Sequence, residues 1–540
     1  MDADNLVYGD VGNRRRSISL AIFCVWVIVV SVLAWNHVVW RDEVKAYSFA
    51  LQSHNIVSIL TGLHGEGHPA LWYLLIHAGH VLFPRPQVLQ IIAFAVAFAS
   101  MLLLVLRSPF SLLVLALLLS SHFALFEYSV MARNYGISML LLFLLATFYH
   151  RHRDRGVLLG SLLFLLANCN VHSVLLVVAF LVFWLLDIVW NSGAPRPQAV
   201  RNFLLNAAIA ILGIALCAVT VFPPDNDVAR MSRPGGIALL LHLIKSLLLP
   251  AQSFSNLLIL GSLQRVMGHL SLLHPPFLRI FILLMSALLF GSTLGLVRRP
   301  AALLASWTAL IGFTLFFNLL YPGMYRYEAL WLIFLVTMYW IAGRGGQQDA
   351  SGPSQRGRPV NRAIQTAGYV MFLILLVLQS YDGLRTIAPL VLRVAPEGRS
   401  RDLGLLISRT PELQRAIILA DPDYELEALP YYLPNPTYLM REHRFGNIVH
   451  FTTKATLKLS LDDILNDALQ LRAQTGRPVV ILLLDRLDPS APAQVIPEAY
   501  DWQLSTTPEQ VRRFQASTRL IQRFGPVSFN DETYDVYAVD

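Results

Sequence analysis

The chain has 540 residues, of which 55% are hydrophobic and only 14% are charged. A soluble domain carries about 25% charged residues, and a single hydrophobic core stops growing at about 250–300 residues. The composition therefore excludes a single soluble globule, a disordered chain and a disulfide-rich secreted scaffold. The mean hydropathy is +0.54, and the many uncharged stretches of about 18–20 residues predict transmembrane helices.

Charge divides the chain into two parts. Residues 382–540 hold 17 basic and 21 acidic side chains, whereas residues 1–381 hold 25 basic and 13 acidic ones. We therefore expect a basic, charge-poor membrane part followed by an acidic tail with the composition of a soluble domain. Arginines at the cytoplasmic ends of spans explain the positive charge of the membrane part, so no nucleic-acid partner is expected. None of the three cysteines lies in the tail, which excludes a disulfide framework there.

The apolar stretches predict about eleven transmembrane helices. The first, Ser17–Trp35, follows three arginines and is expected to be an uncleaved anchor with a cytoplasmic N-terminus. A long outer loop, 36–87, contains the apolar stretch Leu71–Phe83, which is too short to span and is expected to lie at the membrane surface. The other spans are expected near residues 88–106, 110–127, 135–149, 156–171, 174–190, 203–222, 275–297, 301–320, 328–343 and 363–381.

With the remaining segments included, we expect a mainly helical polytopic membrane protein with a small C-terminal extracytoplasmic α/β domain. A second outer loop, 223–274, contains the apolar stretch Ile237–Leu249, and residues 343–362 form a flexible basic cytoplasmic linker. The predicted domains are residues 1–381 and 382–540. Within the tail we expect strands at Ala416–Ala420 and Pro478–Leu484, helices at Leu459–Ala473 and ending in Phe514–Leu520, and a hairpin at Pro526–Val539.

Seven of the 13 acids in the membrane part are expected on its outer face. They are Asp42, Glu43, Glu66, Glu127, Asp225, Asp227 and Glu328. Polar groups at the same borders of the spans include His68, Arg133, Tyr135, His172, Tyr325 and Arg326. Ionisable groups are costly in a membrane, at about 2.5–3.5 kcal/mol near its centre, so this clustering indicates a functional site. A carboxylate base with arginine anchors suits chemistry on a phosphate-bearing substrate.

Each of these residues also has a structural interpretation. Asp42 and Glu43 can also be interpreted as solvated acids that follow a span. His68 can be interpreted as a residue at the start of a helix. Arginines at the interface are also explained as snorkelling side chains. His77 and His80 lie on an apolar helix, where a structural role is the usual one. Asp225 and Asp227 stand beside Pro223-Pro224, as turn residues do.

Several motifs resemble those of one enzyme family. Trp40-Arg41-Asp42-Glu43-x-x-x-Tyr47 resembles the acidic loop motif of GT-C superfamily membrane glycosyltransferases, in particular the protein O-mannosyltransferase and aminoarabinose transferase branch (glycosyltransferase family 39 type). The segment Gly67-His68-Pro69-Ala70-Leu71-Trp72-Tyr73 is similar to that family's His-Pro-Pro-Leu-Tyr-Tyr segment, with Ala70 in place of the second proline. Glu127-Tyr128-Ser129-x-x-x-Arg133-Asn134-Tyr135 resembles its Ser-x-x-x-Arg-x-Tyr block, and Asn170-Val171-His172 matches a Tyr-Thr-His type segment only at the histidine. The resemblance covers residues 17–345.

The resemblance implies an inverting transfer of one sugar from a polyprenyl-phosphate donor on the outer face. Asp42 would be the general base or the carboxylate that positions the acceptor, and Glu43 would support it or help to hold a divalent metal. Mg²⁺ or Mn²⁺ is compatible with Asp42 and Glu43, although members of the family differ in metal dependence. Arg133 or Arg326 would bind the phosphate, and His68 and His172 would position the acceptor or the phosphate. Further binding residues would be Tyr47, Glu127, Tyr135 and Tyr325.

The partners implied are the lipid bilayer, the lipid-linked donor and an envelope acceptor, which is lipid A, another glycolipid, a polysaccharide or a protein. The expected location is the bacterial inner membrane, which the protein would cross several times. Two alternatives remain open at this point. One is a transporter or lipid flippase with charges along a pathway, and the other is an assembly or sensory protein whose working part is the tail.

Overall fold

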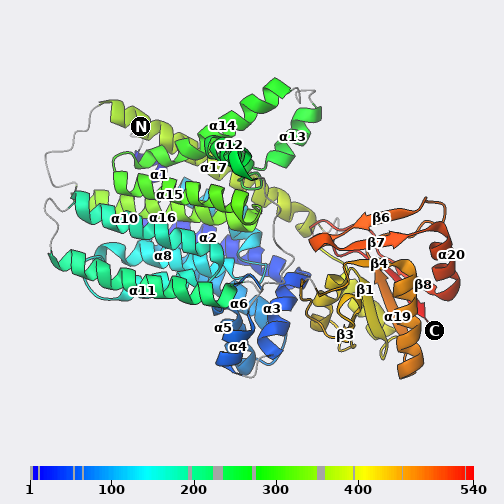
Figure 1. Ribbon diagram of the computed structural model, residues 1–540. Helices are drawn as coiled ribbons and strands as arrows, with labels where there is room; N and C mark the ends of the chain where they lie inside the picture. The colour runs from blue at the N-terminus through cyan, green and yellow to red at the C-terminus, as the bar shows by residue number, and fades with distance from the viewer. Residues whose placement is uncertain are drawn as a thin grey trace.

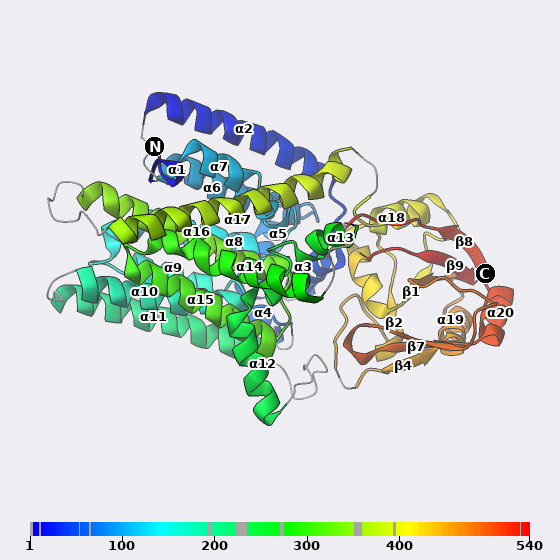
Figure 2. The same cartoon turned by 90° about the horizontal axis from the view of Figure 1, so that it is seen from above.

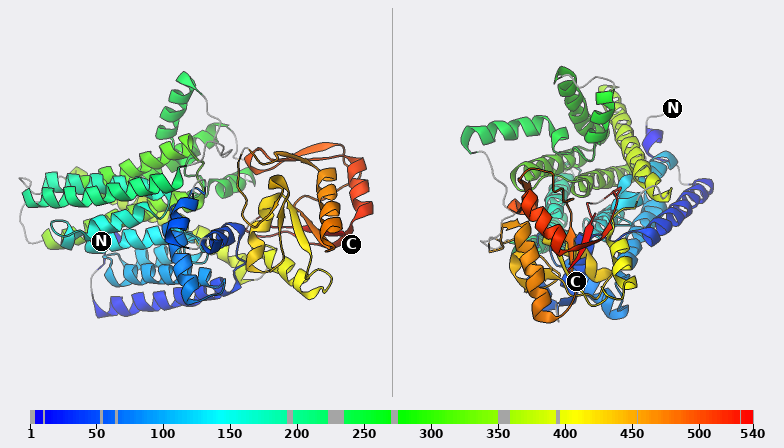
Figure 3. Two further views of the ribbon diagram at one scale, coloured as in Figure 1. Left: turned by 60° about the horizontal axis from the view of Figure 1, so that its bottom comes forward. Right: turned by 90° about the vertical axis from the view of Figure 1, so that its right-hand side faces the viewer.

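The structure is a computed structural model in which a helical bundle carries a smaller α/β unit at one end (Figure 1). The long helices of the bundle lie side by side, and the α/β unit abuts the end where they terminate in two further views (Figures 2 and 3). The structure describes the chain except for residues 1–3, 10–11, 53–54, 64–65, 192–196, 223–234, 270–274, 350–358, 393–395, 453, 530 and 540.

The bundle is formed by the first part of the chain. Its elements are α1 (Asp4–Val7), α2 (Asn13–Asn36), α3 (Arg41–Gln52), α4 (Ile56–Gly62), α5 (Leu71–Leu82), α6 (Val88–Arg107), α7 (Leu112–Leu119), the π-helical turn η1 (Phe123–Glu127), α8 (Tyr135–His152), α9 (Leu158–Ala167), α10 (Val171–Asn191), α11 (Pro197–Val221), α12 (Gly236–Leu248), η2 (Pro250–Gln252), α13 (Leu260–His269), α14 (Pro275–Thr293), η3 (Leu294–Leu296), α15 (Pro300–Leu319), α16 (Tyr325–Asp349) and α17 (Pro359–Val391).

The prediction of a mainly helical, multi-pass membrane protein is confirmed. Within the described residues, seven helices are long and apolar enough to cross a membrane: α2, α6, α10, α11, α14 with its extension to Leu296, α15 and α17. The count of eleven spans is not confirmed. The stretch that we expected at the surface is the 12-residue helix α5, which is too short to span at 1.5 Å per residue.

Two of the predicted spans are broken or short. The stretch 110–127 is the short helix α7, a serine turn and η1 rather than one helix, because the hydroxyls of Ser120 and Ser121 bond to carbonyls of the preceding turn and compete with helix continuation. The stretch 156–171 contains only the ten residues of α9. Its end is set by Asn168, whose side chain binds the carbonyls of Phe164 and Gly213.

Helices enter the segments predicted as linker and domain boundary. Helix α16 continues to Asp349 and α17 begins at Pro359, so the ends of the predicted flexible linker 343–362 are helical, and its centre lies outside the described residues. Helix α17 also runs through residue 381, where the tail was expected to begin, and ends at Val391. The acidic Asp382 is buried and bonds to His122 of the bundle at 2.7 Å, so its charge belongs to the bundle and not to the tail.

The α/β unit holds all the strands found in the described residues. Its elements are α18 (Ser400–Arg409), β1 (Ile417–Asp421), η4 (Asp423–Tyr431), β2 (Tyr438–Leu439), η5 (Met440–Glu442), β3 (Arg444–Phe445), β4 (Lys458–Ser460), α19 (Leu461–Thr475), β5 (Val479–Leu483), β6 (Gln494–Pro497), η6 (Ala499–Asp501), β7 (Gln503–Thr506), α20 (Pro508–Ser517), β8 (Arg519–Arg523) and β9 (Asp535–Val539). The main sheet has the order β1-β5-β9-β8, with β1 and β5 parallel and the other pairs antiparallel.

Both faces of this sheet are covered, as the continuous apolar runs in β1 and β5 predicted. Alternate residues of β1 pack on α19 and α20 on one face and on α18 and η4 on the other. Ser460 caps the start of helix α19 and forms a capping box with Asp463, and Gly476, with φ +65°, caps its end. The sequence analysis predicted the bounds of β1, α19 and β5 to within two residues.

The last predicted elements of the tail were misplaced. Helix α20 ends at Ser517, and the hairpin partner of β9 is β8 rather than a strand after Pro526. Pairing of β8 with the fully buried strand β9 takes Leu520 into the sheet, so tertiary pairing overrides the local helical pattern.

The α/β unit is attached to the bundle through charged contacts around α3. Arg41 binds Glu425 at 2.8 Å and Asp531 at 2.8 Å, and Lys45 lies 3.2 Å from Glu427. Because Glu425 and Glu427 belong to η4, this short helix of the tail is held directly against α3.

A buried chain of hydrogen bonds fixes the start of α3. Glu43 is fully buried, and its Oε2 accepts from the Trp40 N–H at 2.8 Å and bonds to His37 Nε2 at 2.9 Å. Its Oε1 accepts from the Ala132 N–H at 2.5 Å. The other ring nitrogen of His37 bonds to Glu397 of the tail. Burial lowers the pKa of His37, but the two carboxylates outweigh it and hold this pKa well above its ordinary value.

We expect Glu43→Gln to lower the free energy of unfolding by about 3 kcal/mol, the cost of breaking a buried ion pair. An amide directs an N–H toward groups that are already donors and leaves the His37 cation with one carboxylate fewer. Denaturant unfolding in detergent micelles measures the change. The control is Glu412→Gln, which alters a carboxylate that is 75% exposed and should shift stability by less than about 0.5 kcal/mol. Equal losses in the two variants would contradict this role of Glu43.

Candidate active site

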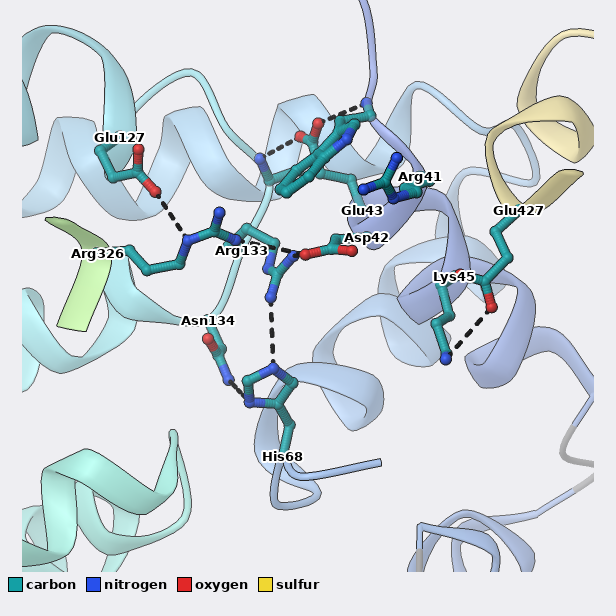
Figure 4. Close-up of polar contacts among 12 residues, drawn as sticks. Arg41, Asp42, Glu43, Lys45, His68, Glu127, Arg133, Asn134, Arg326 and Glu427 are labelled. Carbon is teal, nitrogen blue, oxygen red and sulfur yellow. Dashed lines mark hydrogen bonds and ion pairs between the residues drawn. The ribbon is translucent and has the colours of Figure 1, made fainter. Parts of the chain in front are cut away.

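Asp42 is the centre of a cluster of charged side chains at the end of the bundle that faces the tail. It lies in the first turn of α3 and is 34% exposed, whereas its two arginine partners are buried. Arg133 forms an ion pair with Asp42 Oδ2, and Arg326 Nη1 lies 3.4 Å from the same oxygen. Figure 4 shows both guanidinium groups pointing toward this carboxylate. The other oxygen of Asp42 makes no hydrogen bond within the described chain.

Burial opposes ionisation of Asp42, but the guanidinium groups of Arg133 and Arg326 outweigh it and hold the pKa of Asp42 well below its usual range. The carboxylate is therefore ionised throughout the physiological range of pH.

His68 links the loop before α5 to the loop that carries Arg133. Its Nε2 lies 3.3 Å from Arg133 Nη2, and its Nδ1 lies 3.3 Å from the amide nitrogen of Asn134 (Figure 4). Burial and the nearby Arg133 charge lower the pKa of His68 to about 3, so its ring is neutral and offers a lone pair. The amide of Asn134 is fixed in turn by donating to the Cys169 carbonyl at 2.7 Å.

Asp42, His68 and Arg133 line one cavity of about 420 Å³. This volume lies in the range of small-molecule sites, about 300–1,000 Å³. One side of the cavity is charged, and another side is apolar, with Val171, Val221 and Phe316 contributed by α10, α11 and α15. These three residues stand at the ends of candidate membrane spans. The cavity therefore joins an ionic site to the edge of the apolar membrane region.

His172 lines the same cavity from the first turn of α10. Its ring stacks on Tyr327, with centroids 4.1 Å apart and planes at 12°. Both ring nitrogens are buried and have no hydrogen-bond partner among the described residues. A buried imidazole without a partner is costly, so this histidine is positioned to bond to a ligand.

The tail closes the cavity opposite the bundle. Tyr424, Glu427 and Phe451 line it together with Lys45 of α3. The Lys45 ammonium lies between Glu427 at 3.2 Å and Glu66 at 3.7 Å, and 5.1 Å from the centre of the Phe451 ring. Burial raises the pKa of Glu427 to about 7, against the opposing effect of Lys45. The cavity is thus built from both parts of the chain.

The structure brings four of the sequence-predicted site residues into this cavity: Asp42, His68, Arg133 and His172. Arg326 stands behind Asp42, where it also lies 3.6 Å from Glu127 and 5.0 Å from the Trp40 ring centre. Arg326 contacts Asp42 but does not line the cavity. It is therefore placed to hold the Asp42 carboxylate in position.

Five other predicted residues lie outside the cavity lining. Glu43 faces His37 and Ala132, and Tyr47 bonds to His80 at 2.9 Å. Glu127 is buried against Arg326, Tyr325 donates to Gln379 at 2.7 Å, and the ring of Tyr135 packs edge-on against His68 at 6.3 Å. Of these five, Tyr135 contacts a side chain that lines the cavity, namely His68. Of the acids expected outside, Asp225 and Asp227 lie outside the described residues.

Sequence reasoning missed several residues of the cavity. Lys45 follows Asp42 by three residues and shares its face of α3, a spacing that could have identified it. Asn134 stands next to Arg133 within the motif itself. Glu427, Tyr424 and Phe451 carry no signal in the sequence, because their approach to α3 depends on how the tail docks.

The residues proposed for a metal do not fit one in this arrangement. Among the described residues, no group of three or more histidine, cysteine, aspartate or glutamate side chains is disposed to hold a metal ion. Asp42 faces two guanidinium groups, and both oxygens of Glu43 are occupied by the His37 ring and backbone N–H groups. A divalent cation would meet positive charge beside the one carboxylate and a filled shell at the other.

Comparisons with known proteins give two structural neighbours. No family model matches the chain, and no curated protein matches it. The chain is similar to a crystal structure of ArnT from Cupriavidus metallidurans bound to undecaprenyl phosphate, with a TM-score of 0.44 and 13% identity over 97% of each chain. It is also similar to the apo state of that protein, with a TM-score of 0.42 and 12% identity over 96% of this chain and 98% of the other.

Proposed function

We propose that this protein transfers a single sugar from a polyprenyl-phosphate donor to an acceptor of the cell envelope, with inversion at the anomeric carbon. The observation that carries the proposal is the cavity itself, in which the Asp42–Arg133 pair meets the apolar ends of three membrane spans. A lipid phosphate has the same two-sided chemistry.

Arg133 suits the phosphate of the donor. Its guanidinium lines the cavity, and arginine binds phosphate oxygens through paired, charge-assisted hydrogen bonds. The prenyl chain would leave the cavity past Val171, Val221 and Phe316, which stand at the ends of α10, α11 and α15. As the sugar leaves, the phosphate gains negative charge, and a fixed guanidinium stabilises that charge in the transition state.

Asp42 suits the acceptor side of the reaction. The acceptor hydroxyl attacks the anomeric carbon, the bond from that carbon to the phosphate oxygen breaks, and the hydroxyl proton passes to the Asp42 carboxylate. A single displacement needs one carboxylate beside the attacking hydroxyl and no covalent nucleophile. Asp42 has one oxygen free for this purpose, since its described partners both bind the other oxygen.

Donor binding would also adjust the basicity of Asp42. In the structure Arg133 and Arg326 both hold its pKa low, which makes it a weak base. A bound phosphate shares the Arg133 charge and weakens its hold on Asp42, while Arg326 keeps the carboxylate in place. The base would therefore become stronger when the donor is present.

The orientation follows from the distribution of arginines. We place the tail and the cavity outside the cell in a bacterial inner membrane. The opposite end of the bundle carries Arg107, Arg151 and Arg201 near helix ends and Arg298 in the turn before α15, which suits the cytoplasmic side. The acceptor, whether lipid A, another glycolipid, a polysaccharide or a protein, would enter between α3 and the tail.

We expect Asp42→Asn to insert and fold like the parent protein but to lower the transfer rate by about 10²–10⁴-fold, the usual contribution of a general base. The measurement is transfer of a radiolabelled sugar from polyprenyl phosphate by purified protein in vesicles supplied with envelope lipid extract. Asp488→Asn is the matched control, because that carboxylate lies in an exposed loop of the tail.

Full activity of well-folded Asp42→Asn would remove Asp42 from the reaction. Movement of the lipid donor across the vesicle membrane by the parent protein, with no sugar transferred, would instead favour a transporter.

We expect Arg133→Ala to lower kcat on the order of 10²–10³-fold, because the guanidinium is assigned to the leaving phosphate, and to raise KM for the donor more than KM for the acceptor. Initial rates with each substrate varied in turn give these constants. Arg85→Ala, which removes an exposed arginine outside the cavity lining, should leave them unchanged. A larger rise in KM for the acceptor would move Arg133 to the acceptor.

A further inference from the structure

A second cavity lies at the opposite end of the bundle from Asp42. Helices α6, α8 and α16 all run away from the candidate active site, and their later turns enclose a space of about 620 Å³. We refer to this space as the basic cavity, and its lining residues are Leu103, Arg107, Thr147, Phe148, His150, Arg151 and Arg344. The volume is sufficient for a lipid headgroup or a ligand of similar size.

The basic cavity concentrates positive charge without a compensating acid. Three arginines and a histidine line it, and no acid occurs among the described lining residues. Arg107 and Arg151 are exposed, and neither forms an ion pair with an acid in the described part of the chain. The acid Asp187 of α10 does not line this cavity. Its carboxylate accepts hydrogen bonds from Tyr149 at 2.7 Å and Arg153 at 3.1 Å instead. Like charges held together repel, so an anion would relieve this arrangement.

Arg344 makes the cavity a fixed structure rather than a loose group of side chains. It donates to the Thr147 carbonyl at 3.1 Å and to the Arg107 carbonyl, which ties the ends of α8 and α6 to α16. His150 bonds to the Ile341 carbonyl at 2.9 Å and holds α8 to α16 from the other side. The preference of arginine for cytoplasmic span ends accounts for the presence of these residues but not for their convergence on one cavity.

The wall of the basic cavity also has an apolar part, which lies next to the arginines. Leu103 precedes Arg107 by one helical turn, and Phe148 lies in the turn before Arg151. Residues three or four apart share a helix face, so hydrocarbon contact is available directly beneath the cationic groups. This combination fits a phosphate that carries an apolar chain better than a free phosphate ion.

We propose that the basic cavity binds the phosphate headgroup of an anionic membrane lipid at the face of the membrane opposite the candidate active site. Arg107 and Arg151 supply the charge, Arg344 fixes the helix ends, and Leu103 and Phe148 contact the first part of the acyl chain. Basic pockets between membrane helices bind anionic lipids through this combination of contacts.

The test uses the full-length protein in nanodiscs of phosphatidylcholine with phosphatidylglycerol as the probe lipid, and native mass spectrometry counts the retained lipid. We expect the parent protein to retain phosphatidylglycerol and Arg107→Gln/Arg151→Gln to retain it about 30-fold less, because each cation near an anionic lipid contributes about a factor of five. The matched control is Arg201→Gln/Arg298→Gln. It removes the same charge from exposed arginines at the same end of the bundle and should retain lipid like the parent.

A second variant changes no charge. Leu103→Trp fills the apolar wall and should also reduce lipid retention if the acyl chain lies there. Equal retention by the parent and the double arginine variant would overturn the proposal, as would an equal loss in the matched control. Titration of the parent with inorganic phosphate tests the other source of the same chemistry. Saturable phosphate binding that needs Arg107 and Arg151, with no retention of phosphatidylglycerol, would assign the cavity to soluble phosphate instead.

Discussion

The buried carboxylate of Glu43 is the constraint on which the candidate site depends. Its two oxygens bond to the His37 ring, the Trp40 N–H and the Ala132 N–H, so one side chain joins the end of the first membrane helix, the start of α3 and the loop before α8. Asp42 precedes Glu43 by one residue, and Arg133 follows Ala132 by one residue. The ion pair at the centre of the site is therefore held from both sides by adjacent backbone groups.

The same network ties the tail to the membrane part. His37 contacts Glu397, while Arg41 and Lys45 contact Glu425 and Glu427 of η4. As a result, Tyr424 and Phe451, which form one wall of the cavity, are held in a fixed position relative to α3. A domain that would otherwise be a small independent α/β unit therefore forms one wall of the cavity around Asp42.

Sequence patterns predicted the architecture better than its details. Arginines and long apolar runs indicated the bundle, and the runs in β1 and β5 indicated a sheet buried on both faces, because these features reflect local hydropathy. The serine turn after α7 and the short α9 escaped prediction, since hydrogen bonds of Ser120, Ser121 and Asn168 end those helices within apolar sequence. In the site, motif residues identified Asp42, His68, Arg133 and His172. The separate environments of Asp42 and Glu43 depend on the rotation of about 100° between consecutive residues of a helix and on what packs against each side of α3. The contribution of the tail to the cavity depends on how the tail docks. Local sequence patterns encode neither.

The most direct measurement of the central claim is mass spectrometry of envelope lipids and glycans from cells that lack the gene. The proposed function predicts that one species loses the mass of a single sugar when the gene is disrupted. Expression of the parent protein should restore that sugar, whereas expression of Asp42→Asn should not. An unchanged set of envelope lipids and glycans, or full restoration by Asp42→Asn, would contradict a sugar transfer centred on Asp42.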